Sequence, residues 1–408
     1  MKILTADFIL TCNEDFDVLT HGAICFDKTI VEVGRKEDLI KKYPNAEVTD
    51  LPKNSILMPG LINPHVHLEF SSNTSSLAYG DFMSWLNSVI EKRDDLLLTC
   101  SDEIIEEQLK IMLQSGTTTI GAVSSFGNDF DACLRAKQRV VFFTEVLGSR
   151  PDSVDILFDS FKSRLRIAQD NESERFIPAI SIHSPYSTHP ILAKNALDLA
   201  RKFGYAVSTH FMEARAERDW LDNGKGEFYD FFANFSPYAK PLCTALEYIE
   251  LFRGTKTLFT HCVQATANEL EAIKNIGGAV THCPVSNRLL GVGKLDMKKV
   301  EETHSTLTIG TDGLSSNISL NLWDEMRAVI FTHTQEALND LAKKVLIATT
   351  KDAATALNLN CGQIAEGKFA DLIVCQMAQE IENKEDLPLQ LILHTKHTHL
   401  TFIAGESV

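Results

Sequence analysis

Histidines gather where short apolar runs of the sequence end. Of thirteen histidines, six stand at the ends of such runs, which are rich in β-branched residues: His65, His67, His183, His210, His261 and His282. The last run ends in Thr311-Asp312. Imidazole nitrogens and a carboxylate oxygen together suit a borderline divalent metal such as Zn²⁺ or Fe²⁺. The pattern therefore predicts a centre for one divalent metal ion.

His65 and His67 form the most informative pair. Side chains alternate between the two faces of a strand, so residues two apart point the same way and both imidazoles can reach one ion. A His-x-His pair alone is more often structural than functional. Here it is joined by His210 with Glu213 three residues later, and by the Thr-Asp-Gly at 311–313. This combination favours a functional site.

Residues 56–361 alternate between short apolar runs and longer helical patterns. The expected strands are 55–63, 117–123, 139–146, 177–183, 206–210, 255–261, 278–282 and 305–311. Helical patterns lie between them, as at 102–115, 190–203, 266–275 and 324–333. This alternation indicates βαβ units with a parallel sheet. Eight strands favour a closed (β/α)8 TIM-type barrel, in which functional groups project from the carboxyl ends of the strands.

Both ends of the chain are rich in short β-type runs instead. Residues 1–55 contain runs at 2–10, 22–26 and 29–33, and residues 362–408 contain runs at 370–375 and 399–403. We expect one small β-sandwich domain built from 1–55 and 362–408, beside a catalytic barrel at 56–361.

Composition excludes several other classes. Hydrophobic residues make up 44% and the formal net charge is −16, which indicates a globular chain with no nucleic-acid partner. No apolar run is long enough to span a membrane, and no secretory signal is recognisable. The nine cysteines lack disulfide or zinc-ribbon spacing. We therefore expect a cytoplasmic protein with reduced thiols and no membrane partner.

Six motifs resemble the amidohydrolase superfamily, in the branch of nucleoside and nucleobase deaminases and triazine hydrolases. They are PGLINPHVHLEF (59–70), STHFMEARAE (208–217), THCVQA (260–265), THCPVSNRLLGVG (281–293), IGTDGLSSN (309–317) and GQIAEGKFADLIV (362–374). They span nearly the whole chain in the order that this family has. The resemblance implies a metal-bearing (β/α)8 barrel with a β-sandwich from both termini.

The resemblance also implies roles for individual residues. The metal ligands would be His65, His67, His210 and Asp312. Glu213 would carry protons, His261 would hydrogen-bond the metal-bound water, and His282 would help to shape the reacting centre. His183 and Trp85 would contact the substrate. No lysine stands at the end of the fourth strand, where two-metal members have one, so a single metal is expected, Zn²⁺ before Fe²⁺.

The substrate implied is a small adenine nucleoside that loses its 6-amino group. Within the branch the chain most resembles the 6-aminodeoxyfutalosine deaminases of menaquinone biosynthesis, whose substrate carries a benzoate on its ribose side. An arginine is the natural partner of that carboxylate. Candidates are Arg150 and Arg288, and beside them Arg215 and Arg218.

Several alternatives stay open at this point. The chain could deaminate methylthioadenosine, adenosylhomocysteine, adenosine or guanine, or displace chloride from a triazine, or be a non-catalytic barrel scaffold. His183 and His282 could be structural, Trp85 could be a core residue, and each arginine could be a surface residue. A homo-oligomer is neither indicated nor excluded by the sequence.

Overall fold

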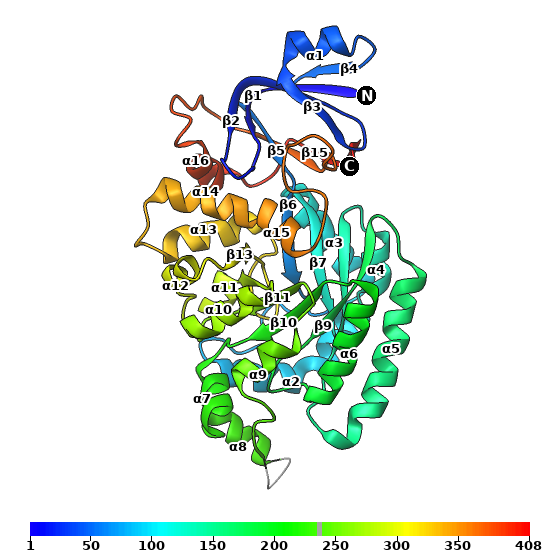
Figure 1. Cartoon of the computed structure of the whole chain (residues 1–408), viewed down its shortest axis with the longest axis vertical. Coiled ribbons are helices and arrows are strands. Elements are labelled where there is room, and N and C mark those ends of the chain that lie inside the picture. Colours follow the sequence, from blue (N-terminus) through cyan, green and yellow to red (C-terminus); the bar gives the residue numbers. More distant parts are fainter. Residues whose placement is uncertain (235–238) are drawn as a thin grey trace.

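The computed structural model describes residues 1–234 and 239–408, and its larger unit is a barrel of parallel strands (Figure 1). Eight strands pair in chain order, each parallel to the next. They are β6 (Leu61–Val66), β7 (Thr117–Ser124), β8 (Arg139–Val146), β9 (Phe176–Ile182), β10 (Val207–Phe211), β11 (Thr257–His261), β12 (Ala279–His282) and β13 (Thr306–Ile309). The expected (β/α)8 architecture is confirmed.

A buried asparagine joins the first barrel strand to the last. The side chain of Asn63 on β6 donates to Thr311 Oγ1 at 2.7 Å and accepts from the Thr311 backbone N–H at 3.2 Å. Just beyond, the Asp312 N–H donates to the His65 carbonyl at 3.1 Å. The Asn63 amide therefore supplies the hydrogen bonds that a regular ladder would make at this seam.

Helices cover the outside of the barrel. They are α2 (Phe82–Thr99), α3 (Asp102–Gln114), α4 (Phe130–Arg135), η1 (Pro151–Ser153), α5 (Val154–Asp170), α6 (Pro190–Phe203), α7 (Arg215–Asn223), α8 (Glu227–Ala233), α9 (Ala245–Leu251), α10 (Ala267–Asn275), α11 (Pro284–Leu289), α12 (Met297–Glu302), α13 (Leu322–Thr332), α14 (Leu338–Ala348) and α15 (Lys351–Ala356). In α6, Leu192, Ala196 and Ala200 recur at helical spacing and are buried. None of the described helices has the length and apolarity that crossing a membrane requires.

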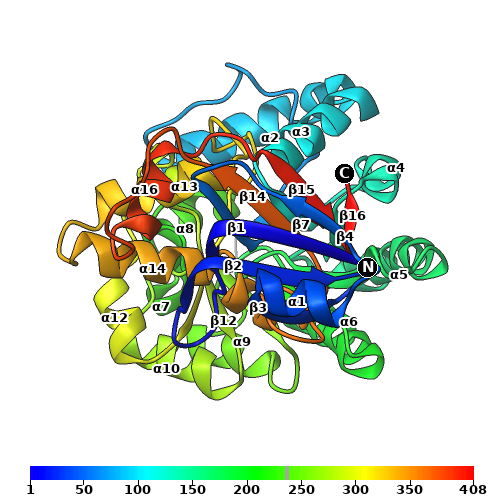
Figure 2. The same cartoon turned by 90° about the horizontal axis from the view of Figure 1, so that it is seen from above.

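A second eight-stranded sheet combines both ends of the chain and lies across one end of the barrel (Figure 2). Its strands are β1 (Lys2–Leu10), β2 (Val18–Phe26), β3 (Ile30–Arg35), β4 (Glu47–Asp50), β5 (Ser55–Pro59), β14 (Leu372–Gln376), β15 (Leu400–Ile403) and β16 (Glu406–Ser407). Helix α1 (Lys36–Lys42) follows β3, and α16 (Leu387–His394) precedes β15. The expected β unit from both termini is present.

The run 55–63, which we expected to form one barrel strand, is two strands in different sheets. β5 pairs with β1 and β14 of the terminal sheet, whereas β6 pairs with β7 of the barrel. Gly60 separates them, and a Cβ there would lie 2.2 Å from Thr118 Oγ1. The chain passes between the sheets at a place where no side chain fits. The division into domains at 55 and 362 stays a prediction.

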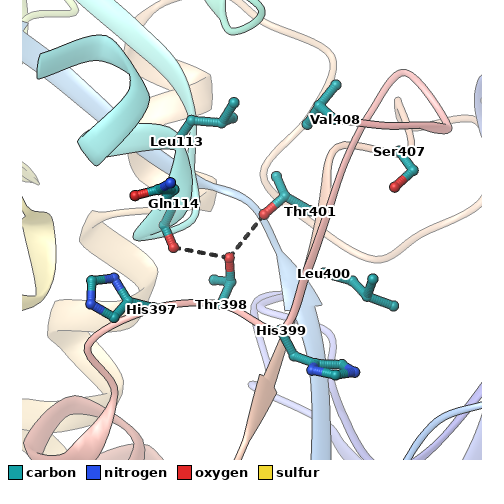
Figure 3. Close-up of a pocket in the computed structure, with 9 residues that line it drawn as sticks. All are labelled: Leu113, Gln114, His397, Thr398, His399, Leu400, Thr401, Ser407 and Val408. Atoms are coloured by element: carbon teal, nitrogen blue, oxygen red, sulfur yellow. Dashed lines mark hydrogen bonds between the residues drawn. The ribbon is translucent and has the colours of Figure 1, made fainter. Parts of the chain in front are cut away.

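The segment before β15 touches the barrel through Thr398 (Figure 3). Its N–H donates to the Gln114 carbonyl at the end of α3, at 2.9 Å, and its hydroxyl donates to the same oxygen at 3.2 Å. A cavity of about 390 Å³ lies here, between α3 and the C-terminal strands.

Candidate active site

Three of the six strand-end histidines meet at the carboxyl end of the barrel. His65 lies on β6, His67 follows that strand and His210 lies on β10, and their ligand nitrogens lie within 4.8 Å of one another. His67 Nε2 and His210 Nε2 are 3.2 Å apart, and the buried His65 Nε2 has no hydrogen-bond partner among the described residues. Two nitrogens of a tetrahedral zinc site are about 3.3 Å apart, given Zn–N bonds of about 2.05 Å. The three rings therefore fit a metal ion.

Hydrogen bonds to the other ring nitrogens orient these histidines. His210 Nδ1 lies 2.9 Å from the His183 carbonyl, so it must carry the proton and leave Nε2 as an acceptor. His65 Nδ1 lies 3.3 Å from Thr260 Oγ1. Burial lowers the pKa of His65 and of His67, which keeps both rings neutral. Neutral rings that point their lone pairs at one place are what a cation requires.

Asp312 completes this group from the last strand end. Its Oδ1 lies 3.9 Å from His65 Nε2 and 3.8 Å from His67 Nε2, while its Oδ2 accepts from Ser286 at 2.8 Å and from Ser316 at 2.9 Å. Burial alone would raise the pKa of Asp312, but the surrounding histidines outweigh it and hold that pKa well below its usual range. Its Oδ1 also accepts from the Gly313 N–H at 2.8 Å, so Asp312 is an anion with both oxygens held, and Oδ1 faces His65 and His67.

Glu213 and His261 lie on the other side of Asp312. His261 Nε2 is 3.5 Å from Glu213 Oε1 and 3.9 Å from Asp312 Oδ2. Burial raises the pKa of Glu213 well above its usual range, and the nearby negative charges of Asp312 and Glu217 raise it further. Glu217 accepts the N–H groups of Met212 and Glu213, at 3.0 and 2.9 Å, and so holds the turn between β10 and α7. Glu213 is therefore held in place with a raised pKa, which suits a group that donates a proton.

A chain of hydrogen bonds leads from His261 away from the cavity. His261 Nδ1 lies 2.9 Å from Asn287 Oδ1, Asn287 Nδ2 lies 3.3 Å from His282 Nδ1, and His282 Nε2 lies 3.2 Å from His333 Nε2. The chain gives His261 a proton on Nδ1. The backbone of His261 has φ +75°, an uncommon conformation for a histidine that tends to occur at functional sites. His282 contacts Asn287 and His333 and does not line the cavity.

The cavity in front of these groups has a volume of about 180 Å³ and is lined in part by α2, a helix that lies at the end of the barrel opposite the terminal sheet (Figure 1). Its lining includes His67, His183, His210, Glu213, His261, Asp312 and Trp85. The Trp85 indole N–H donates to the Ser315 carbonyl at 2.8 Å, which fixes the ring. Burial lowers the pKa of His183 to about 4, so its ring is neutral. Both residues predicted to contact substrate therefore lie beside the histidine cluster.

The four arginines predicted as carboxylate partners lie elsewhere. Arg150 pairs with Asp152 and lines a different cavity, and Arg288 is exposed on α11. Arg215 pairs with Asp219, and the buried Arg218 pairs with Glu269. None of the four lines the cavity that holds Glu213. Local sequence could not separate them, because the direction of each side chain depends on the packing of its helix or loop.

Two buried carboxylates near the cavity were missed by sequence reasoning. Glu145 at the end of β8 accepts from Ser125 Oγ at 2.5 Å and from Ser181 Oγ at 3.0 Å. Glu69 accepts the backbone N–H groups of the loop after β7, at residues 125–128. Both had a visible signal, since each is an isolated charge beside an apolar strand end.

Comparisons with known proteins agree with this geometry. The model of the amidohydrolase family matches residues 56–408. An aminodeoxyfutalosine deaminase from a Nitratiruptor species is 45% identical over 406 residues, which is 100% of this chain and 99% of that protein. The chain belongs to the amidohydrolase family. This family depends on metal ions, and the clusters of His, Asp and Glu described above could hold one.

Two solved structures superimpose over nearly the whole chain. The aminofutalosine deaminase of Helicobacter pylori, in complex with methylthio-coformycin, is 35% identical with a TM-score of 0.95, covering 100% of both chains. An adenosine deaminase from Xanthomonas campestris with bound zinc is 20% identical with a TM-score of 0.82, covering 99% of this chain and 92% of that one. The second likeness shows the fold alone.

Proposed function

We propose that this protein is a metal-dependent aminohydrolase that removes the 6-amino group of an adenine nucleoside. The substrate that we infer is 6-amino-6-deoxyfutalosine, which would give futalosine and ammonia in menaquinone biosynthesis. The observation that carries the proposal is the meeting, beside one cavity, of three histidines whose ligand nitrogens converge with Glu213, whose pKa is raised by burial, and Asp312, whose pKa is lowered by the histidines. The full-length likeness to an aminodeoxyfutalosine deaminase supports the choice of substrate.

His65, His67, His210 and Asp312 would hold one divalent ion. Such an ion lowers the pKa of a bound water to about 7 and so makes it a nucleophile at neutral pH. We infer Zn²⁺ from the nitrogen-rich donor set and from the zinc in the X. campestris protein of the same fold, with Fe²⁺ as the alternative.

Glu213 is the proton donor in the proposed reaction. As the water oxygen bonds to C6 of the purine, Glu213 gives its proton to the adjacent ring nitrogen, and Asp312 accepts a proton from the water. His261, held by Asn287 through Nδ1, directs the lone pair of Nε2 at the same place, where it can accept a hydrogen bond from the attacking water. The C6–N bond then breaks as Asp312 passes its proton to the leaving amine, which departs as ammonia, and the proton of the new C6 hydroxyl returns to Glu213.

His183 and Trp85 would place the nucleoside. The neutral His183 ring offers a donor or an acceptor to the purine, and the fixed Trp85 indole offers a flat surface for a ring. We also infer a cytoplasmic location, since all nine cysteines are free thiols. An acidic chain of charge −16 gives no reason to expect a nucleic-acid partner.

Loss of adenine absorbance tests the proposal directly. The purified protein is given 6-aminodeoxyfutalosine, methylthioadenosine, adenosylhomocysteine, adenosine and guanine, while its metal content is assayed in parallel. We expect the highest kcat/KM with 6-aminodeoxyfutalosine and about one metal ion per chain. If the protein turns over no 6-aminopurine nucleoside of this panel, the proposed deaminase activity is refuted. A preference for methylthioadenosine would instead support the alternative that the methylthio-coformycin complex of the H. pylori protein suggests.

A further inference from the structure

One wall of the cavity differs in character from the histidine cluster. It is made by Phe70, by Arg93 on α2 and by Phe126 in the loop after β7. Phe70 and Phe126 lie edge to face, with ring centroids 6.5 Å apart, and the Arg93 guanidinium carbon is 5.8 Å from the Phe126 centroid. Among the described residues that line this cavity, Arg93 is the only lysine or arginine. This wall therefore offers two aromatic rings and one cation.

The guanidinium of Arg93 keeps donors free. Its Nε donates to Asp94 at 3.0 Å, and the side chain of that aspartate is 86% exposed. The two terminal nitrogens donate to no residue within 1–234 or 239–408. Paired terminal N–H groups of arginine match the two oxygens of a carboxylate. Arg93 can therefore receive an anionic group without losing a buried partner.

The aromatic part of this wall is fixed but uncovered. Glu69 accepts the N–H groups of Ser125, Phe126 and Gly127 at 2.7–3.0 Å, which holds the loop that carries Phe126. Even so, 38% of the Phe126 surface is exposed, and so is 38% of that of Leu147, which also lines the cavity. Apolar side chains held open at the mouth of a cavity are typical of a binding surface.

We propose that Arg93, Phe126 and Phe70 form the subsite for a carboxylated aromatic group on the substrate. The carboxylate pairs with the free guanidinium nitrogens, and the ring of the group packs on Phe126 and Phe70. This inference rests on the proposed function, because the adenine must occupy the cavity beside Glu213. It assigns the benzoate side of the nucleoside to α2 and to the loop that Glu69 holds.

Arg150 is the natural competitor for this role. It lines a neighbouring cavity of about 520 Å³, together with Lys240, Trp220 and Tyr186. Tyr186 lines both cavities and so stands between them. Arg150 also lies in an ion pair with Asp152, in which both side chains are well exposed. It therefore serves as a matched control, being an arginine near the site but outside the cavity that holds Glu213.

The test compares Arg93→Met and Arg150→Met on two substrates. With Arg93→Met we expect KM for 6-aminodeoxyfutalosine to rise about 10- to 100-fold, the range for a lost hydrogen bond to a charged group. KM for adenosine, metal content and thermal midpoint stay near wild type. Arg93→Lys recovers part of the loss, since lysine keeps the charge without the paired donors. Arg150→Met leaves both substrates unchanged.

Three results would overturn the subsite. They are an equal loss on both substrates, no loss on the carboxylated one, or the selective loss appearing in Arg150→Met instead. The wild-type enzyme separates this failure from that of the proposed function. If wild type prefers the carboxylated nucleoside and Arg93→Met keeps that preference, only the subsite is wrong. If wild type shows no such preference, the proposed substrate fails and the subsite fails with it.

Discussion

The chain contains two His-x-His sequences, and they have different surroundings. In 65–67 both histidines are enclosed by the barrel, their ring centroids are 4.9 Å apart, and His210 and Asp312 lie against them. In 397–399 both histidines are exposed, and Figure 3 shows their rings directed apart. The cavity beside the exposed pair is the larger, at about 390 Å³ against 180 Å³. Neither the His-x-His spacing nor the volume of the neighbouring cavity therefore shows which of the two places can do chemistry.

The direction of the neighbouring strands makes the difference. β6 ends beside strands that run the same way, so polar residues from several strand ends face the same space. The segment 397–399 lies between α16 and β15, and its N–H groups bond to Gln114 and Val374. No acidic side chain lines its cavity among the described residues. A histidine pair becomes a metal site only where other strands supply the remaining ligands.

The largest expected effect is a direct contrast between the two pairs. In His67→Ala we expect metal content to fall from about one ion per chain to near zero and activity to fall below detection, because one of four ligands is lost. In His397→Ala we expect both to stay at the wild-type level. Elemental analysis and the absorbance assay measure this contrast. Metal retained by His67→Ala would remove His67 from the ligand set.

Glu213→Gln separates proton transfer from metal binding within the buried site. We expect kcat to fall about 10²–10⁴-fold, the usual contribution of a general acid, while metal content stays unchanged. The glutamine keeps the shape of the side chain but has no acidic proton to give. Should metal be lost as well, Glu213 would belong with the ligands and not with the proton carriers.

Asn287→Ala tests the hydrogen-bond chain behind His261. We expect kcat to fall about 10- to 100-fold with little change in KM, because His261 Nδ1 loses a buried acceptor. We expect a smaller fall in kcat for His333→Ala, at the far end of the same chain of hydrogen bonds. Steady-state kinetics of both variants show which fall is larger. If His333→Ala lowers kcat as much as Asn287→Ala does, the chain of hydrogen bonds would matter for packing and not for the position of His261.

The smallest expected effect concerns the exposed pair. Thr398→Val removes the hydroxyl bonds to the Gln114 carbonyl and to Thr401 but keeps the backbone bond. We expect a loss of about 0.5–1.5 kcal/mol in the free energy of unfolding, measured by denaturant titration, with kcat/KM unchanged. A fall in activity at constant stability would show that the two ends of the barrel are coupled.

Most of the fold follows from patterns that are local in the sequence. The run at 139–146 is β8 to the residue, and the helical pattern at 190–203 is α6, which begins at Pro190 and ends before Gly204 in the left-handed conformation. The break at Gly60 was not predictable, because apolar residues continue across it while the hydrogen-bond partners change from one sheet to the other.

The residues of the site also divide into those that the sequence could reveal and those that it could not. His65 and His67 could be paired because strand alternation sets where they point, and His210 was added from its place at a strand end and from the family resemblance. Arg93 could not be found in this way, since it lies late in the long helix α2, and only the packing of that helix brings it to the cavity. Glu69 was visible as an isolated charge beside a strand end, but its partners are backbone N–H groups, which every sequence has, so its role in holding the loop was not predictable.

The seam closed by Asn63 has a consequence for how the protein is made. The proposed ligands His65 and His67 lie on one side of this seam and Asp312 on the other, and Asn63 and Thr311 are 248 positions apart in the chain. During synthesis the donor set stays incomplete until the last barrel strand has left the ribosome. An ion bound there would tie the first strand to the last, so metal uptake and completion of the barrel would be a single event.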